Sequence, residues 1–249
     1  MMEIDTNFNF YSDASGDDPD SSSPTLKRYH KLLWSKPIPN GKLFELHDNM
    51  SGAYLYHASE LGEFYLGSDA ITHSYRYQKR KQWLIQQIPK EAEELFNTGS
   101  TIGAYILFPN RRIDGKQTIN QARGVNSLID DRFDLTLECI RRFYSGIDSP
   151  LYDTLLVYKG FFDLFKDFNG YVQFFLLEDL VSKDGSVKFY LPFDSFASPP
   201  TFSDVSDYLT YKQKVSEFLY SRHPATMFFL NFVDTPMGII YDVNEIPYQ

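Results

Sequence analysis

The stretch between residues 126 and 146 constrains the fold most, because every local signal in it predicts the same amphipathic helix. Apolar residues recur at spacings of three and four and form one stripe; they are Ile129, Phe133, Leu137, Ile140 and Tyr144. We expect Ser127 to cap the N-terminus and Gly146 to end the helix. Asp130 and Asp131 would then lie in the first turn, where the helix dipole favours carboxylates.

The opposite face of this helix is polar. Glu138 and Arg142 have the i,i+4 spacing of a helical ion pair. Cys139, the single cysteine, lies beside the apolar stripe. A lone cysteine in such a setting is more often a packing residue than a nucleophile. One cysteine also excludes a disulfide framework, which suits a reducing compartment.

The connection that leads into the helix is basic. Before it, the apolar run 102–108 is rich in β-forming residues and predicts a buried strand. Free amides and the helix dipole make a basic connection at a helix N-terminus suitable for an anion. Charge runs more often form solvated ion pairs, and no P-loop or dinucleotide-binding glycine spacing is present. The bases of the connection are Arg111, Arg112, Lys116 and Arg123.

The same region also suggests an enzyme hypothesis. In it, Arg123 or Lys116 holds an anionic substrate, while Asp131 or Asp134 acts as a general base. The candidate catalytic residues are Asp131, Asp134 and Lys116, and the candidate ligand-binding residues are Arg111, Arg112, Lys116, Asn120, Arg123 and Arg132.

The net charge of −9 is unevenly distributed. Residues 1–25 hold six acids and no base, which leaves −3 for the other 224 residues. A nearly balanced body argues against broad, non-specific binding of nucleic acid. The run 76–81 is the exception, because it is basic and interleaved with aromatic residues and could therefore bind single-stranded nucleic acid. Such a run more often forms the solvated end of a helix.

Two groups of residues suggest metal sites, but neither has the required spacing. Asp13, Ser15 and Asp17 resemble the opening of a calcium loop, yet Asp18 and Pro24 occupy the positions of its glycine and glutamate. The same acids could instead cap a helix. The second group lacks any known zinc spacing; it consists of His47, His57, Glu60, Glu63 and His73. We therefore predict no metal and no cofactor.

The remaining signals complete the list of expected elements. A Ser23-Pro24 cap starts a helix over 24–35, and residues 171–181 favour a helix, with a strand as the alternative. The apolar tail after residue 223 is expected to form strands at 226–233 and 238–243. Further strands are expected at 42–47, 53–57, 63–66 and 187–192, and further helices at 77–97, 150–168 and 205–222.

Five long motifs stand out in the chain: DPDSSSPTLKRYHKLLWSKPIPNG (18–41), HASELGEFYLGSDAI (57–71), DGKQTINQARG (114–124), DRFDLTLECIRRFY (131–144) and the FFLLEDLV to VKFYLPFD run (174–194). They resemble a family of bacterial proteins known only as a domain of unknown function. The resemblance covers about residues 8–223 and implies a soluble bacterial protein in one unit. It carries over no reaction, cofactor or catalytic residue.

Together these signals predict an α+β fold, with a small antiparallel sheet covered by four to six helices in a single compact domain. Residues 1–23 form an acidic arm, 24–223 the domain, and 224–249 a tail docked on the body or on a dimer partner, with a monomer favoured. No signal peptide or membrane-length apolar stretch is present, so we expect a cytoplasmic protein. The favoured function is binding of an anionic small molecule or nucleic acid; an enzyme and a protein-interaction module are the alternatives.

Overall fold

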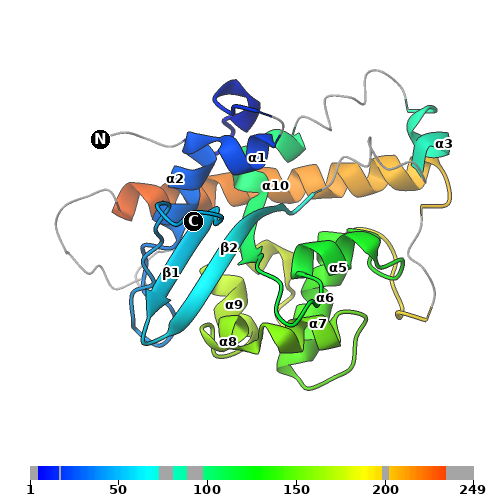
Figure 1. Cartoon of the computed structure of the whole chain (residues 1–249). Coiled ribbons are helices and arrows are strands. Elements are labelled where there is room, and N and C mark those ends of the chain that lie inside the picture. The colour runs from blue at the N-terminus through cyan, green and yellow to red at the C-terminus, as the bar shows by residue number, and fades with distance from the viewer. Residues whose placement is uncertain (1–4, 17, 73–80, 89–97, 198–201, 234–249) are drawn as a thin grey trace, which may run out of the picture.

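A three-stranded antiparallel sheet forms one part of the fold (Figure 1). The computed structural model describes residues 5–16, 18–72, 81–88, 98–197 and 202–233. The strands lie in the order β1 (Leu55–Ser59), β2 (Gly62–Ala70) and β3 (Tyr105–Pro109). All five residues of β3 are buried, so this strand lies inside the core.

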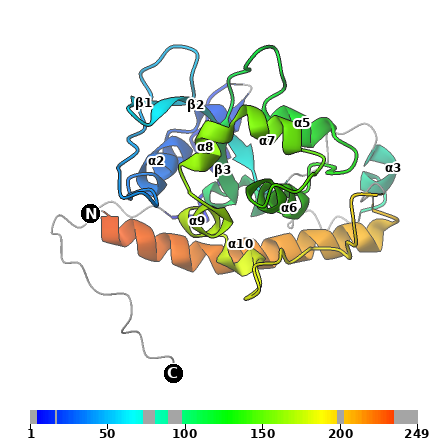
Figure 2. The same cartoon turned by 90° about the horizontal axis from the view of Figure 1, so that it is seen from below.

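Nine α-helices lie among the described residues, more than the four to six expected. They are α1 (Pro19–Ser22), α2 (Pro24–Leu33), α3 (Gln82–Ile85), α5 (Ile119–Val125), α6 (Phe133–Tyr144), α7 (Tyr152–Val157), α8 (Lys159–Asp163), α9 (Phe168–Phe174) and α10 (Val205–Val233). Figure 2 shows α10 running along one whole side of the molecule, past α6 and α9. The predicted α+β class is confirmed, in a single compact domain.

The acidic arm is docked on the body and caps α2. Backbone amides of Ile102 and Gly103 donate to carbonyls in the arm, at 3.1 Å each. Ser23 caps α2 as predicted, since its Oγ accepts from the Leu26 amide at 3.1 Å. Asp13 in turn accepts from the Ser23 hydroxyl at 2.6 Å and from the Thr25 amide at 3.0 Å. Asp13, which resembled a calcium ligand in the sequence, therefore helps to cap α2. This is the alternative role that the sequence allowed for it.

The central helix begins later than the sequence predicted. Residues 119–125 form the separate helix α5, which Thr118 and Gln121 cap reciprocally, and α6 starts only at Phe133. Between them, Asp130 and Asp131 have φ values of 49° and 61°, which a right-handed helix excludes. Ser127 therefore caps no helix. Gly146, with φ of 67°, follows the end of α6 as predicted.

Three other predicted segments also differ. The strand expected at 102–108 begins at Tyr105, after a 3-10 turn at Ile102–Ala104. Segments 42–47 and 187–192 form no strand: His47 makes a single bridge to Tyr56 of β1, and Val187 makes a single bridge to Val181, outside the sheet. The helix expected over 150–168 is broken at Tyr158, whose φ of −104° and ψ of 25° interrupt it between α7 and α8.

The tail prediction is wrong for its first strand, because α10 continues as a helix to Val233. The helix favoured at 171–181 is confirmed in its first part by α9, followed by a 3-10 turn at Glu178–Leu180. The second tail strand at 238–243, most of the basic run 76–81 and the second half of the predicted helix 77–97 lie outside the described residues.

The core is rich in aromatic rings, as the composition predicts. Trp34, directly after α2, is completely buried and joins α2 to α8 and α9. Aromatic pairs at such distances add stability beyond the area they bury. Five ring centroids lie 4.8–6.0 Å from that of Trp34, those of Phe44, Phe161, Phe165, Phe174 and Phe175.

Two helical glycines provide a matched test of this packing. A Cβ at Gly170 would lie 2.1 Å from the Phe165 carbonyl oxygen, whereas a Cβ at Gly160 would meet nothing within 4 Å. We expect Gly170→Ala to lower the free energy of unfolding by roughly 1–3 kcal/mol or more. Gly160→Ala should leave it unchanged or raise it by up to about 1 kcal/mol. Urea unfolding gives the free energy of unfolding of both variants. Equal changes in the two variants would contradict the close packing of α9 at Gly170.

His30 of α2 is a buried histidine that pairs with no acid of the described residues. Its side chain is fully buried, its Nδ1 has no hydrogen-bond partner, and its Nε2 lies 3.4 Å from the Ser68 hydroxyl. Burial, with a smaller contribution from the positive charge of Arg222, lowers its pKa from 6.5 to about 3. The folded protein therefore keeps this imidazole neutral at pH values where the unfolded chain protonates it.

This difference makes stability depend on pH. Because the folded pKa lies below the unfolded one, stability from His30 is complete above pH 6.5 and falls as the pH drops toward 3. Between pH 7 and pH 5 the expected loss is about 2 kcal/mol. Urea unfolding at both pH values should show that His30→Phe removes about this much of the loss. An equal loss in both proteins would show that His30 is not the responsible group.

Candidate functional site

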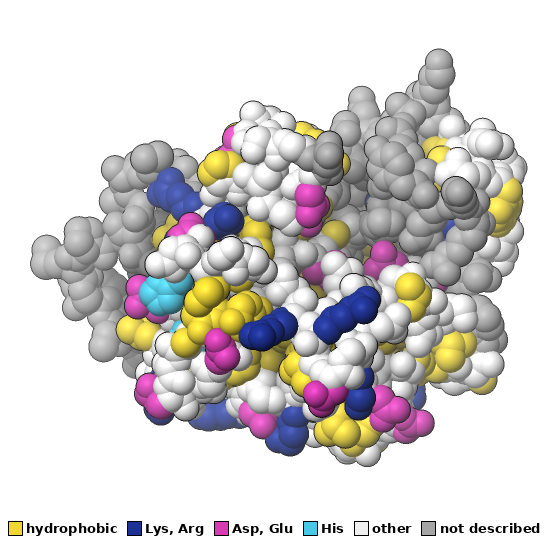
Figure 3. Space-filling view, viewed as in Figure 1, with side chains coloured by type: hydrophobic (Ala, Val, Ile, Leu, Met, Phe, Trp, Pro, Cys, Tyr) yellow, Lys and Arg dark blue, Asp and Glu magenta, His cyan; other side chains and the backbone are white. Residues whose placement is uncertain are grey.

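A cleft of about 400 Å³ opens between the start of β2, the loop after β3 and the junction of α7 with α8. Figure 3 shows this face of the molecule, where an apolar patch lies beside basic side chains. The cleft is lined by Glu63, Phe64, Tyr65, Pro109, Arg111, Arg112, Ile113, Asp114, Val157, Tyr158, Gly160 and Phe161.

The loop after β3 is held at its start by β2 and by Tyr158, which lies between α7 and α8. The Asn110 amide donates to the Tyr65 carbonyl at 3.0 Å, and its side chain lies against Gly67, where a Cβ would come within 2.7 Å of it. The buried Tyr158 hydroxyl donates to the Arg111 carbonyl at 3.0 Å. These contacts place Arg111 and Arg112 at the cleft. The break between α7 and α8 therefore has a structural role, since it presents Tyr158 to the loop.

Neither arginine of the cleft forms an ion pair with a carboxylate of the described residues. The Arg111 guanidinium lies over the Tyr65 ring, 4.4 Å from its centroid. Arg112 donates from Nε to the Gln121 side chain at 3.0 Å. Glu63 also lines the cleft, but one of its oxygens accepts from the hydroxyls of Tyr56 and Tyr65, at 2.8 and 3.1 Å. Guanidinium N–H groups thus remain available to a ligand.

A second groove of about 270 Å³ adjoins the first and shares Ile113, Asp114 and Val157 with it. Lys116 lines this second groove and is exposed. Asn120 is exposed on α5 and lines neither groove. The predicted Asp114-Gly115 turn is present, with φ values of 50° and 72°.

Arg123 lies elsewhere, completely buried beneath the end of β2. Its NH1 lies 2.8 Å from an Asp69 oxygen and 2.9 Å from the Ala70 carbonyl oxygen, and its Nε lies 3.3 Å from an Asp131 oxygen. Burial by itself lowers the pKa of Arg123. The two carboxylates raise it by more, so the net shift of this pKa is upward. Burial raises the pKa of Asp69, and Arg123 opposes that rise. A ligand from solvent does not reach this guanidinium.

Arg132, Asp134 and Asp130 are buried in the same way. Arg132 and Asp134 pair at 2.6 Å, and Asp134 also accepts from the Tyr190 amide at 2.9 Å. Asp130 pairs with Lys81 at 2.6 Å. These four predicted residues therefore form two ion pairs, Arg123 with Asp131 and Arg132 with Asp134, and none of them lines either groove. Lys81, the described end of the basic run 76–81, is buried as well.

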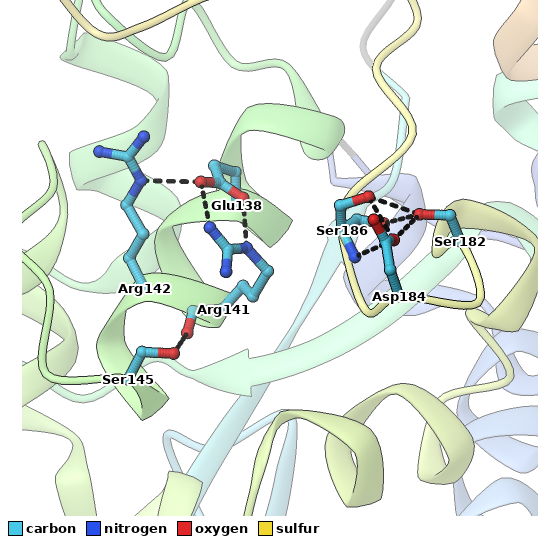
Figure 4. A network of polar contacts seen from close by, with 7 residues as sticks. All are labelled: Glu138, Arg141, Arg142, Ser145, Ser182, Asp184 and Ser186. Carbon is cyan, nitrogen blue, oxygen red and sulfur yellow. Dashed lines mark hydrogen bonds and ion pairs between the residues drawn. The ribbon is translucent and has the colours of Figure 1, made fainter.

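The bases at the end of α6 are also paired (Figure 4). Glu138 is only 4% exposed and accepts from Arg141 at 2.7 and 2.9 Å and from Arg142 at 2.7 Å. In the nearby turn, hydrogen bonds from Ser182 and Ser186 lower the pKa of Asp184 to about 2. The predicted pair of Glu138 with Arg142 is present, and Arg141 shares the same carboxylate.

The other reactive candidates are occupied or buried. Burial raises the pKa of Cys139 to about 12, so it is a thiol at neutral pH and packs in the core. His57 is stacked on Phe44 and bonded to the Glu45 carbonyl and the Ser59 hydroxyl, at 2.7 and 2.8 Å. Within the described ranges, no three His, Cys, Asp or Glu side chains are placed to hold a metal. Nor is any helix there long and apolar enough to cross a membrane.

The aromatic part of the cleft was not predicted from the sequence. Tyr65 and Phe64 were assigned to a strand, and Tyr158 and Phe161 to a continuous helix, with no sign that they meet the basic loop. A weak signal existed in Gly160, because a glycine within an apolar helix often marks a break or a close approach.

Comparison with known protein families identifies one family that matches this chain. A family model described as "Family of unknown function (DUF6994)" matches residues 4–225. No curated protein and no solved structure matches the chain.

Substitution of a buried base should change the free energy of unfolding far more than substitution of an exposed one. Arg123→Met leaves the buried Asp69 without this partner and removes the ion pair to the partly exposed Asp131, so we expect the free energy of unfolding to fall by about 3–5 kcal/mol. Lys116→Gln removes an exposed charge and should change it by less than about 0.5 kcal/mol. Denaturant midpoints measure both. A small effect of Arg123→Met would reopen a ligand-binding role for that residue.

Proposed function

The chain belongs to this family of unknown function, and we propose that it binds a small molecule with an anionic group on an aromatic or apolar body. The binding site of this proposal is the cleft between β2 and α8. The observation that carries it is the pair of arginines, Arg111 and Arg112, without a carboxylate partner among the described residues beside an apolar wall.

The chemistry of the cleft supports this ligand class. A guanidinium offers several N–H donors in one plane and binds carboxylate or phosphate oxygens through two parallel hydrogen bonds. The Arg111 guanidinium is held over the Tyr65 ring, a contact that leaves its N–H groups available for hydrogen bonds. Phe64, Val157 and Phe161 line the cleft as apolar surface for the rest of the ligand. A volume of about 400 Å³ lies within the usual range for small-molecule sites.

Charge favours a small ligand over nucleic acid. Glu63 and Asp114 line the cleft and Asp153 the adjoining groove, and these carboxylates would repel a polyanion lying across both. Lys81 contributes to the Asp130 ion pair rather than to a basic surface. We assign no reaction, because the carboxylates of Asp131 and Asp134 point to ion-pair partners and line neither groove.

Phenyl phosphate is a suitable first probe, since it combines a phosphate with one ring. We expect calorimetric titration to show that it binds more tightly than inorganic phosphate. The double variant Arg111→Gln, Arg112→Gln should weaken phenyl phosphate binding by about tenfold or more. Lys183→Gln is the matched control, because Lys183 is exposed but lines neither groove. Equal affinities for the double variant and wild type would contradict the proposal.

A second variant blocks the cleft without touching its charges. Gly160 lines the cleft with open space above it, so Gly160→Leu should occupy part of the ring site and weaken phenyl phosphate binding more than phosphate binding. Single-stranded oligonucleotides should bind no more tightly than phenyl phosphate. Tight oligonucleotide binding that survives Gly160→Leu would favour the nucleic-acid alternative instead.

A further inference from the structure

The two adjoining grooves differ in charge along their length. Arg111 and Arg112 lie in the first groove, and Asp153 lies in the second. Ile113, Asp114 and Val157 are common to both and so mark the boundary between them. A ligand that crossed this boundary would meet guanidinium groups at one end and carboxylates at the other.

Two carboxylates beyond the arginines, that of Asp114 at the boundary and that of Asp153 in the second groove, are not committed to the protein's own bases. Asp114 and Asp153 are exposed, and neither forms an ion pair with a base of the described residues. Lys116 lines the same groove, so two carboxylates face one ammonium there and the groove has an excess negative charge. This excess suits a cationic group of a ligand and disfavours a second anionic group.

Apolar surface connects the two ends. Ile113 and Leu156 are 43% and 49% exposed, and Val157 lies between the grooves. Large apolar side chains that are exposed together beside a cleft lose unfavourable contact with water when a ligand covers them. The middle of the ligand should therefore be apolar rather than charged.

We infer that the ligand is an elongated zwitterion, with an anionic group at Arg111 and Arg112 and a cationic group at Asp114 and Asp153. Its apolar middle lies across Ile113 and Val157. This inference rests on the proposed function and adds the second charge and its position. It distinguishes the ligand from simple organic phosphates and carboxylates, which would occupy the first groove alone.

Two probes that differ in one amino group test the inference. They are 4-(2-aminoethyl)phenyl phosphate, which carries a phosphate and an ammonium on opposite ends of a ring, and 4-ethylphenyl phosphate, which lacks the ammonium. An exposed ion pair is worth up to about 1 kcal/mol, so wild type should bind the amino probe about two- to fivefold more tightly. Calorimetric titration at low salt gives both affinities and their ratio.

Variants of the carboxylates should abolish that ratio. Asp114→Asn, Asp153→Asn and the double variant remove negative charge, and asparagine adopts the φ of 50° found at residue 114 readily, so the turn is retained. The affinity ratio should fall to about one in the double variant, whereas Asp194→Asn, an exposed acid outside both grooves, should keep the wild-type ratio.

The outcomes separate this inference from the proposed function. If both probes bind through Arg111 and Arg112 with equal affinity, the zwitterion is wrong and the anion site stands. The same holds if the double variant keeps the preference for the amino probe. If neither probe binds, the cleft is not an anion site and both proposals are overturned.

Discussion

The buried charge of Arg123 is the interaction on which the arrangement around the cleft depends. A guanidinium removed from water is costly unless oppositely charged groups surround it, and here Asp69 of β2 and Asp131 of the turn before α6 do so. The ion pairs therefore join α5 to the end of β2 and to the following turn. Asp131 has a left-handed φ of 61° in that turn, and this backbone conformation excludes one continuous helix through residues 126–133.

This anchoring also defines the loop that lines the cleft. The loop leaves β3 at Pro109, where the Asn110 amide bonds to β2, and it reaches α5 at the Thr118 cap. Both ends are thus held by regular secondary structure, while the Tyr158 hydroxyl holds the Arg111 carbonyl in between. With the backbone fixed at these points, the side chains of Arg111 and Arg112 remain at the surface. A rigid support of this kind is what a binding site requires.

Several charged side chains in the described part of the chain are buried and stabilise the fold. Asp134 links the start of α6 to the Tyr190 amide, so the segment after residue 187 satisfies a backbone donor without joining the sheet. Glu138 collects Arg141 and Arg142 at the other end of the helix. Since these bases are neutralised within the molecule, the two cleft arginines, which form no ion pair within the described ranges, are a more specific signal than the number of basic residues.

Local sequence was sufficient for the features that neighbouring residues determine: the Ser23-Pro24 start of α2, the Asp114-Gly115 turn, the apolar stripe of α6 and its end at Gly146. Each depends on contacts within about one helical turn or on a single φ value. Only the tertiary structure decided which bases of the connection serve the fold and which face the cleft. Arg111 and Arg123 stand in the same basic segment, but Arg123 meets Asp69, 54 positions away in the chain, whereas Arg111 meets the Tyr65 ring. The partner of a charge is set by packing between distant elements, and spacing along the chain does not contain that information.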